Sequence, residues 1–194
     1  TRNNGRLSSK PLDAGWSMPR QASMSIDGQA WQHTPPGHRE GGQMRYELVA
    51  SAPTLWLAWG PIFTREDTDR LLDSAMQRIP QASKFELART RQDRAVTALR
   101  IQSSEDPSNR PGIWIQARQH AWESGSSWVA RGLVEWLAEQ GPSAKWLVDH
   151  TELVIVPIMD VDNVETGNGG KNQKPHDHNR DWSAEPVWPE VRAA

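Results

Sequence analysis

The sequence predicts an α/β domain preceded by a small all-β domain. Up to about residue 60, short extended stretches are separated by turn signals and no helical pattern is present. From residue 61 onward, helical and extended patterns alternate, and the nearly unbroken apolar run at 151–159 is typical of a strand covered on both faces. We therefore expect a β-sandwich over residues 1–60 and an α/β domain over residues 61–194.

The front domain shows turn and strand signals but groups no reactive side chains. Asp27-Gly28 is a dipeptide favoured in tight hairpin turns. A further strand pair is predicted after Gly41-Gly42, and the apolar stretch 54–59 predicts a more buried strand. Nothing in this region places chemical groups together.

The second domain opens with a helix that begins at Thr64, its N-cap, and ends at Pro80. Its apolar stripe comprises Leu71, Leu72, Ala75 and Ile79. Strands are predicted near 84–90, 95–102 and 112–118.

A helix over about 124–140, stopped by Gly141-Pro142, precedes the apolar strand 151–159. Strand, helix and strand in this order predict a right-handed crossover in a sheet. The inward helix face is predicted to comprise Trp128, Val129, Leu133, Trp136 and Leu137.

Composition excludes several classes of function. The formal net charge is −2 and the basic residues are dispersed, which excludes an obvious nucleic-acid footprint. No apolar run approaches the roughly 20 residues that cross a bilayer, so no membrane partner is expected. Without cysteine, a metal must use histidine, carboxylate or water, which favours a catalytic site over a structural one. The eleven tryptophans are interpreted as core and interdomain packing rather than an aromatic binding platform.

Location and assembly are only weakly indicated. The chain opens on Thr1 without a charged-then-apolar leader, so we expect that a targeting segment was removed or the chain trimmed. A cytoplasmic location is slightly favoured over a secreted or periplasmic one, and the sequence does not indicate the oligomeric state.

Two potential metal ligands stand where strand 112–118 meets the following helix. His120 leaves the strand and Glu123 enters the helix three residues later. Such a corner can turn an imidazole nitrogen and a carboxylate toward one point, and zinc accepts both. Taken alone, the pair favours a solvated helix start, with Glu123 complementing the helix dipole.

The long Gly- and Asn-rich loop after strand 151–159 changes that balance. Such a loop belongs at the carboxyl edge of the sheet, where open α/β folds bind ligands. Both segments follow sheet strands, so we expect them on the same edge.

Three motifs in order carry a family resemblance: RQHAWESGSSW (118–128), MDVDNVETGN (159–168) and DHNRDW (177–182). Together they resemble the zinc carboxypeptidase family, most closely its cytosolic-carboxypeptidase-like bacterial branch, which also carries an all-β domain in front. The resemblance implies a mixed-sheet zinc-carboxypeptidase domain, incomplete in this chain.

The resemblance also implies site residues. His120 and Glu123 would be two of the three protein ligands of one zinc ion. Asn179 and Arg180 would hold the C-terminal carboxylate of a peptide or protein substrate, a task that suits the two-pronged guanidinium. The alternative for Arg180 is a structural salt bridge, for instance to Asp177 or Asp181.

The sequence departs from the family pattern at several positions. Ala121-Trp122 replaces Pro-Gly between the two ligands. Gly170 stands where the family has a carbonyl-polarising arginine, and the adjacent Lys171 is the candidate substitute, although lysine is a mobile point charge. Two further histidines in this loop are expected on its polar surface: His176 and His178.

The family's third zinc ligand is a histidine downstream of Asn-Arg, and its general-base glutamate lies further on. No histidine follows Arg180 here, so both are expected beyond residue 194 and the chain alone is expected to be inactive. The resemblance implies a metallocarboxypeptidase that removes C-terminal residues. The alternatives are an N-acyl amino acid deacylase of the same fold and a non-catalytic relative that acts as a binding module.

Overall fold

The computed structural model describes residues 2–3, 6–7, 18–102, 110–171 and 173–194. The chain divides into two compact units, Thr1–Ile62 and Phe63–Ala194, and each is described by itself. The domain assignment proposed from the sequence, with a boundary after residue 60, stays a prediction.

The described part of the first unit is all-β, as predicted, and its strands are short. A three-stranded antiparallel sheet has the order β4-β3-β7. Two further antiparallel pairs are present: β1–β2 precedes this sheet in the sequence, and β5–β6 falls between β4 and β7. The strands are β1 (Arg2–Asn3), β2 (Arg6–Leu7), β3 (Ser23–Ser25), β4 (Gln32–His33), β5 (His38–Glu40), β6 (Gln43–Arg45) and β7 (Trp56–Ala58). The packing of these sheets as a sandwich stays a prediction.

Three local expectations for this unit need correction. Asp27 and Gly28 do form a turn, with φ of 74° at Gly28, but β3 and β4 are joined by the longer segment 26–31. Gly41-Gly42 is itself the turn of the β5–β6 hairpin and does not precede it. The β7 strand is not buried, because Leu57 is 57% exposed and its neighbours are also accessible.

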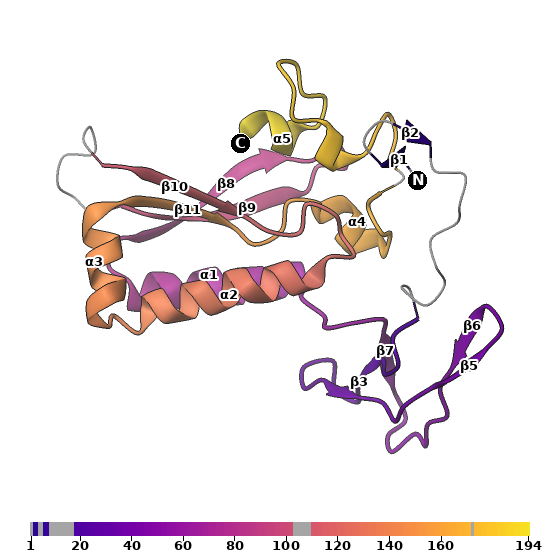
Figure 1. Ribbon diagram of the computed structural model, residues 1–194. Coiled ribbons are helices and arrows are strands. Elements are labelled where there is room, and N and C mark those ends of the chain that lie inside the picture. The colour runs from indigo at the N-terminus through magenta and orange to yellow at the C-terminus, as the bar shows by residue number, and fades with distance from the viewer. Residues whose placement is uncertain (1, 4–5, 8–17, 103–109, 172) are drawn as a thin grey trace. The chain divides into compact units, whose positions relative to one another are not determined.

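The second unit is built on a mixed four-stranded sheet of order β10-β11-β9-β8 (Figure 1). Strands β10 and β11 are parallel, while the β11–β9 and β9–β8 pairs are antiparallel. The strands are β8 (Ala82–Arg89), β9 (Ala95–Ile101), β10 (Gly112–Gln116) and β11 (Glu152–Val156). Leu153, Val154, Ile155 and Val156 are all buried, which confirms that the apolar run is a strand covered on both faces.

Helix α1 (Arg65–Arg78) confirms the sequence prediction. The Thr64 hydroxyl accepts a hydrogen bond from the Asp67 backbone N–H, and the Asp67 carboxylate accepts one from the Thr64 N–H. This reciprocal arrangement satisfies two donors that the first helical turn would otherwise leave unpaired. Figure 1 shows α1 and α2 (Ser124–Ala138) side by side along one face of the sheet, with α5 (Pro189–Ala193) on the opposite face.

The predicted inward face of α2 is wrong for three of its five residues, and Leu133, which packs against the core, is one of the two that are confirmed. Val129 is 75% exposed, and Trp128 and Trp136 are each 39% exposed, whereas Leu137 is fully buried. The helix instead turns a face of mostly small side chains to the core: Ser127, Ala130, Val134 and Ala138. The Ser127 hydroxyl donates to the Pro157 carbonyl at 2.7 Å, so the helix lies close to the sheet and bulky rings are excluded.

The segment after α2 also differs from the expectation. Gly141-Pro142 does end α2, but Pro142 is then the first residue of a further helix, α3 (Pro142–His150). Proline suits a first helical position, because the N–H it lacks would have no intrahelical partner there. The β10–β11 crossover therefore contains two helices.

Most tryptophans are not in the core of either unit. Trp188 is 8% exposed, whereas seven others stand among the exposed large hydrophobic side chains. The interdomain part of the interpretation stays a prediction, whereas the core part is wrong for seven rings: Trp56, Trp59, Trp114, Trp128, Trp136, Trp146 and Trp182. Among the described residues, no helix is long and apolar enough to cross a membrane.

Candidate active site

The carboxyl ends of β10 and β11 are tied together directly beyond the strands. The Ala117 N–H donates to the Val156 carbonyl at 2.8 Å, and the Asp160 N–H donates to the Arg118 carbonyl at 3.1 Å. Arg118 adopts a φ of 54°, which turns the chain sharply before His120. The two loops named from the sequence therefore meet at one edge of the sheet, as expected for parallel neighbours.

His120 and Glu123 lie together at this corner. The His120 Nδ1 atom is 2.9 Å from Glu123 Oε1, and Glu123 is the N-cap of α2. The imidazole is 3% exposed, whereas the Glu123 side chain is 45% exposed. Of the two potential metal ligands, the imidazole is thus held inside the protein, whereas the Glu123 carboxylate faces solvent.

Asp177 orients the His120 ring and was not identified from the sequence. Its Oδ1 atom is 2.8 Å from His120 Nε2. Both ring nitrogens face a carboxylate, Nδ1 at Glu123 and Nε2 at Asp177, so the distances alone do not assign the tautomer. With a metal on Nδ1, the hydrogen would be on Nε2 and Asp177 would accept it. The position of Asp177 in DHNRDW is the one signal that could have suggested this contact.

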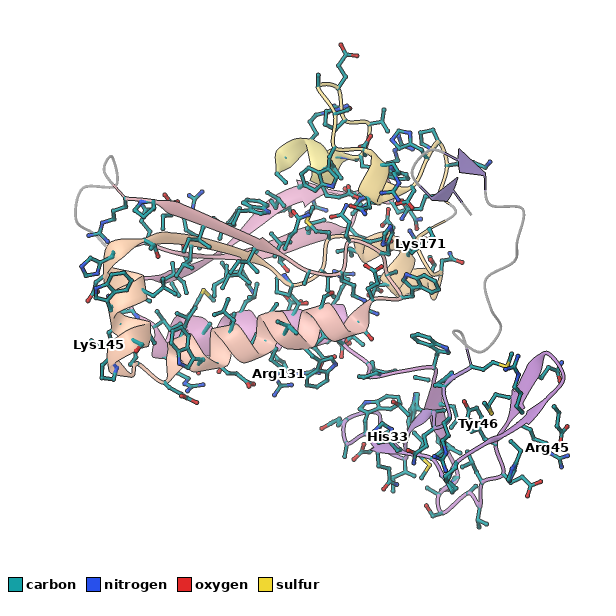
Figure 2. All side chains as sticks on the ribbon, in the orientation of Figure 1. His33, Arg45, Tyr46, Arg131, Lys145 and Lys171 are labelled. Atoms are coloured by element: carbon teal, nitrogen blue, oxygen red, sulfur yellow. The ribbon has the colours of Figure 1, made fainter. Side chains whose placement is uncertain are left out.

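Lys171 reaches the same corner. Its ammonium nitrogen is 3.2 Å from His120 Nδ1 and 3.5 Å from Glu123 Oε1. It also lies 5.6 Å from the centre of the Trp122 ring, within reach of a cation–π contact. Figure 2 shows Lys171 on the side of the second unit where α2 begins and where α4 (Val161–Thr166) lies.

Gly170 cannot carry a side chain in this backbone. Its φ is 88°, and an added Cβ would lie 2.3 Å from Asp160 Oδ2 and 2.8 Å from the Ala121 nitrogen. The position where the family places an arginine is therefore closed here. The cation at this corner comes from the next residue instead.

Asp160 is the buried acceptor around which the two loops close. It is 2% exposed and accepts hydrogen bonds from the Ala121 N–H at 3.1 Å and the Gln173 side chain at 2.9 Å. Burial raises the pKa of this carboxyl above its usual value, because the charged form is desolvated. Burial also lowers the pKa of the nearby Arg118 guanidinium to about 10.

Asn179 and Arg180 lie on a short 3₁₀ turn, His178–Arg180, with Asp177 as its N-cap. Asp177 Oδ1 accepts from the Asn179 N–H at 2.8 Å, and the Asp177 carbonyl accepts from the Arg180 N–H at 2.9 Å. Both side chains are exposed. The turn thus ties the Asn179–Arg180 pair to the carboxylate that orients His120.

The carboxylates considered as salt-bridge partners of Arg180 are engaged elsewhere. Asp177 contacts His120, and Asp181 contacts His176 Nε2 at 2.6 Å. Although burial opposes ionisation, hydrogen bonds from the Trp188 and Val187 N–H groups hold the pKa of Asp181 below its usual value. Within the described ranges, no ion pair of Arg180 is found.

The expected surface position of His178 is wrong. Its side chain is completely buried, and Nε2 lies 2.6 Å from Glu190 Oε1. His176 is partly exposed, as expected of a loop residue. The burial of His178 could not be predicted from the short polar motif, because it arises only when α5 folds back over this turn and covers it.

The His120–Glu123 pair fits one side of a zinc site. Zinc bonds to histidine nitrogen and carboxylate oxygen measure about 2.0–2.2 Å, so two ligand atoms of a tetrahedral site lie about 3.4 Å apart. The observed separation of 2.9 Å is a hydrogen-bond distance, and the two atoms would have to move apart by about 0.5 Å to receive the ion. In the part of the chain that the structure describes, no group of three His, Cys, Asp or Glu side chains could hold a metal. The described residues therefore offer two ligands of a set that generally has three.

Comparison with known proteins defines the class. The model of the zinc carboxypeptidase family matches residues 68–192, more than half of the chain. The chain therefore belongs to the zinc carboxypeptidase family.

Similar curated relatives include several cytosolic carboxypeptidases. The chain is 38% identical over 74 residues to cytosolic carboxypeptidase 1 of Gallus gallus, covering 38% of this chain and 6% of the relative. It is 32% identical over 106 residues to cytosolic carboxypeptidase 6 of Mus musculus, covering 53% and 20%. The chain thus spans only a small part of these relatives.

Solved structures of bacterial metallo-carboxypeptidases share the fold over most of the chain. The one from Burkholderia cenocepacia has a TM-score of 0.79 and 31% identity, covering 93% of this chain and 49% of that chain. The Pseudomonas aeruginosa enzyme, in complex with (2-guanidinoethylmercapto)succinic acid, has a TM-score of 0.75 and 25% identity, covering 93% and 50%. The chain spans about half the length of these structures.

Proposed function

We propose that this chain forms part of a zinc-dependent metallocarboxypeptidase that removes C-terminal residues from peptides or proteins. The observation that carries the proposal is the joint placement of the His120–Glu123 pair, its orienting Asp177 and the exposed Arg180 at one sheet edge. A metal-ligand pair without a carboxylate clamp would suit many hydrolases. The addition of Arg180 specifies a substrate that ends in a free carboxylate.

His120 Nδ1 and Glu123 would hold zinc, with a third ligand expected outside the described residues. Zinc bound there supplies Lewis-acid polarisation of a carbonyl group and activation of water. Asp177 would keep the hydrogen of His120 on Nε2, so that Nδ1 stays a donor of electrons to the metal.

The substrate is positioned by the chain's own cations. The Arg180 guanidinium can form two parallel hydrogen bonds to the terminal carboxylate, with the Asn179 amide beside it. This grip would limit the reaction to the last peptide bond, because only that bond would then lie next to the His120–Glu123 pair. Lys171, whose ammonium nitrogen is 3.2 Å from His120 Nδ1, would stabilise negative charge on the carbonyl oxygen, in place of the arginine that Gly170 excludes.

The test is hydrolysis by the natural protein that contains this chain. N-blocked dipeptides with a free C-terminus, the same dipeptides as C-terminal amides, and N-acyl amino acids are assayed with one equivalent of zinc. The proposal expects release of the C-terminal residue from the free acids only. Preferential cleavage of N-acyl amino acids would favour a deacylase, and absence of zinc binding with no turnover would favour a binding module.

A further inference from the structure

A row of hydrogen bonds links β10 to α5 through the candidate site, and we call it the β10–α5 row. It begins with Trp114 Nε1, which donates to Gln116 Oε1 at 2.8 Å, and continues from Gln116 Nε2 to Gln119 Oε1 at 2.9 Å. Gln119 Nε2 lies 2.9 Å from His178 Nδ1. The row ends at Glu190 Oε1, 2.6 Å from His178 Nε2.

One assignment of hydrogens satisfies every side chain of the row, and it leaves the Gln119 backbone carbonyl, 3.2 Å from His178 Nδ1, without a hydrogen from that ring. Gln119 Oε1 already accepts from Gln116, so the Gln119 amide nitrogen donates to His178 Nδ1. The hydrogen of His178 is then on Nε2 and is donated to the Glu190 carboxylate. All the donors point the same way along the row, an arrangement in which each hydrogen bond strengthens the next.

Stability alone does not explain the inner end of the row. His178 is fully buried and Glu190 is 3% exposed, and the second carboxylate oxygen of Glu190 has no hydrogen-bond partner among the described residues. Withdrawing such a pair from water costs about as much as its attraction returns, and apolar side chains of similar volume would often stabilise the protein as well or better. A buried polar pair in this place suits control of geometry.

The residues on both sides of His178 belong to the candidate site. Asp177 contacts His120 Nε2 at 2.8 Å, and Asn179 and Arg180 form the predicted carboxylate clamp. At the other side of the ring, Gln119 directly precedes His120. Trp188 packs edge-on against the imidazole, with ring centres 5.5 Å apart, and restricts its movement from the side of α5.

We propose that His178, held by Gln119 and Glu190, is a positioning residue that fixes the turn 177–180 relative to His120. The proposal rests on the proposed function in one respect, namely that Arg180 binds the substrate carboxylate. His178 touches neither substrate nor metal. It acts through Asp177 and Arg180. The His178 imidazole sets the distance of these two residues from the His120–Glu123 pair.

The variants are His178→Leu, which removes both contacts in similar volume, and Glu190→Gln, which keeps an acceptor oxygen but removes the charge. His176→Leu is the matched control, because it removes a histidine–carboxylate contact of equal length from the same loop. In that control Asp181 still accepts from the Val187 and Trp188 N–H groups.

The first readout is amide hydrogen exchange of the natural protein that contains this chain, which requires no activity. His178→Leu is expected to speed exchange in the segment 177–181 at least about tenfold, with α1 and β9 unchanged, since the turn would open locally. Glu190→Gln is expected to give a smaller acceleration in the same segment, and His176→Leu none there. Unchanged exchange at 177–181, or an equal increase throughout the second unit, would overturn the proposal.

The second readout is a double-mutant cycle with Arg180→Lys in the natural protein. His178→Leu should raise KM about tenfold in the wild-type background and less than about twofold with Lys at 180, because coupled residues are non-additive. Equal effects in both backgrounds would overturn the proposal. If the wild-type protein cleaves no peptide, the proposed function fails, while hydrogen exchange still decides the role of His178.

Discussion

The two halves of the candidate site are built in opposite ways. The first half is the corner that contains His120 and Glu123, which we call the metal corner. His120 is 3% exposed there, and both of its ring nitrogens lie within 3 Å of a carboxylate oxygen. At the clamp, the backbone of Asn179 and Arg180 is fixed by Asp177, but both side chains are exposed. One half is organised by the protein itself, and the other presents its donors to solvent.

The difference agrees with the roles proposed for the two halves. A metal ligand needs a defined tautomer and direction, which contacts to its second nitrogen provide. A carboxylate clamp must keep its donors unsatisfied until substrate arrives, because an internal ion pair would compete with the substrate. The same residue, Asp177, serves both halves, through its side chain at His120 and through its side chain and carbonyl at the turn.

Loss of a metal ligand should have the largest effect. Zinc sites with four ligands bind with about 10–16 kcal/mol, so one ligand accounts for roughly 3 kcal/mol, a factor of about 100 or more in affinity. We expect His120→Ala in the natural protein to weaken zinc binding by at least that factor and to abolish peptide cleavage. Competition with a chromogenic chelator measures the affinity, and unchanged zinc binding would mean that the corner is structural.

Arg180→Lys should separate the clamp from the metal corner. Lysine keeps the charge but loses the planar fork, so one charge-assisted hydrogen bond worth about 1.5–3 kcal/mol disappears, which corresponds to roughly 10–150-fold in KM. Zinc affinity should stay within about twofold, because Arg180 has no described contact with His120 or Glu123. Steady-state kinetics on a blocked dipeptide provide the check. Unchanged kinetics would show that Arg180 has no part in substrate binding.

Asp177→Asn should affect both halves at once. The amide oxygen can still accept from His120 Nε2, but it lacks the full negative charge, so we expect zinc affinity to fall about tenfold, at the lower end of effects at such positions. KM should rise as well, because the N-cap of the turn is weakened. The informative comparison is with Arg180→Lys, which should change KM but not zinc affinity. If Asp177→Asn also changes KM alone, Asp177 does not support zinc binding at His120.

Lys171→Met should give the smallest effect, with opposite signs for metal and turnover. Its ammonium lies 3.5 Å from Glu123 Oε1, so its removal should raise zinc affinity a few-fold by relieving like-charge repulsion. Turnover should fall about tenfold, because a cation near the carbonyl oxygen is lost. Calorimetric zinc titration and kcat on the same preparation test both signs. A fall in zinc affinity would contradict the role assigned to Lys171.

Periodicity and local chemistry were sufficient to predict much of the scaffold. The capped helix from Thr64, the buried strand β11 and the meeting of two loops at one sheet edge were all foreseeable, because each depends on neighbours in the chain or on a simple rule for parallel strands. The zinc carboxypeptidase family was equally accessible, since three motifs in order carried it.

The inward face of α2 and the burial of the DHNR turn depended on tertiary packing. Trp128 and Val129 are apolar, yet the close approach of α2 to the sheet favours Ser127 and Ala130 at the contact, and no helical periodicity encodes that distance. Similarly, His178 is polar in a polar motif, and only the return of α5 covers it and supplies Glu190 as its partner. The sequence by itself determined local caps, strand character and the motif residues. Packing between segments distant in the chain decided which side chains are buried and which of them touch.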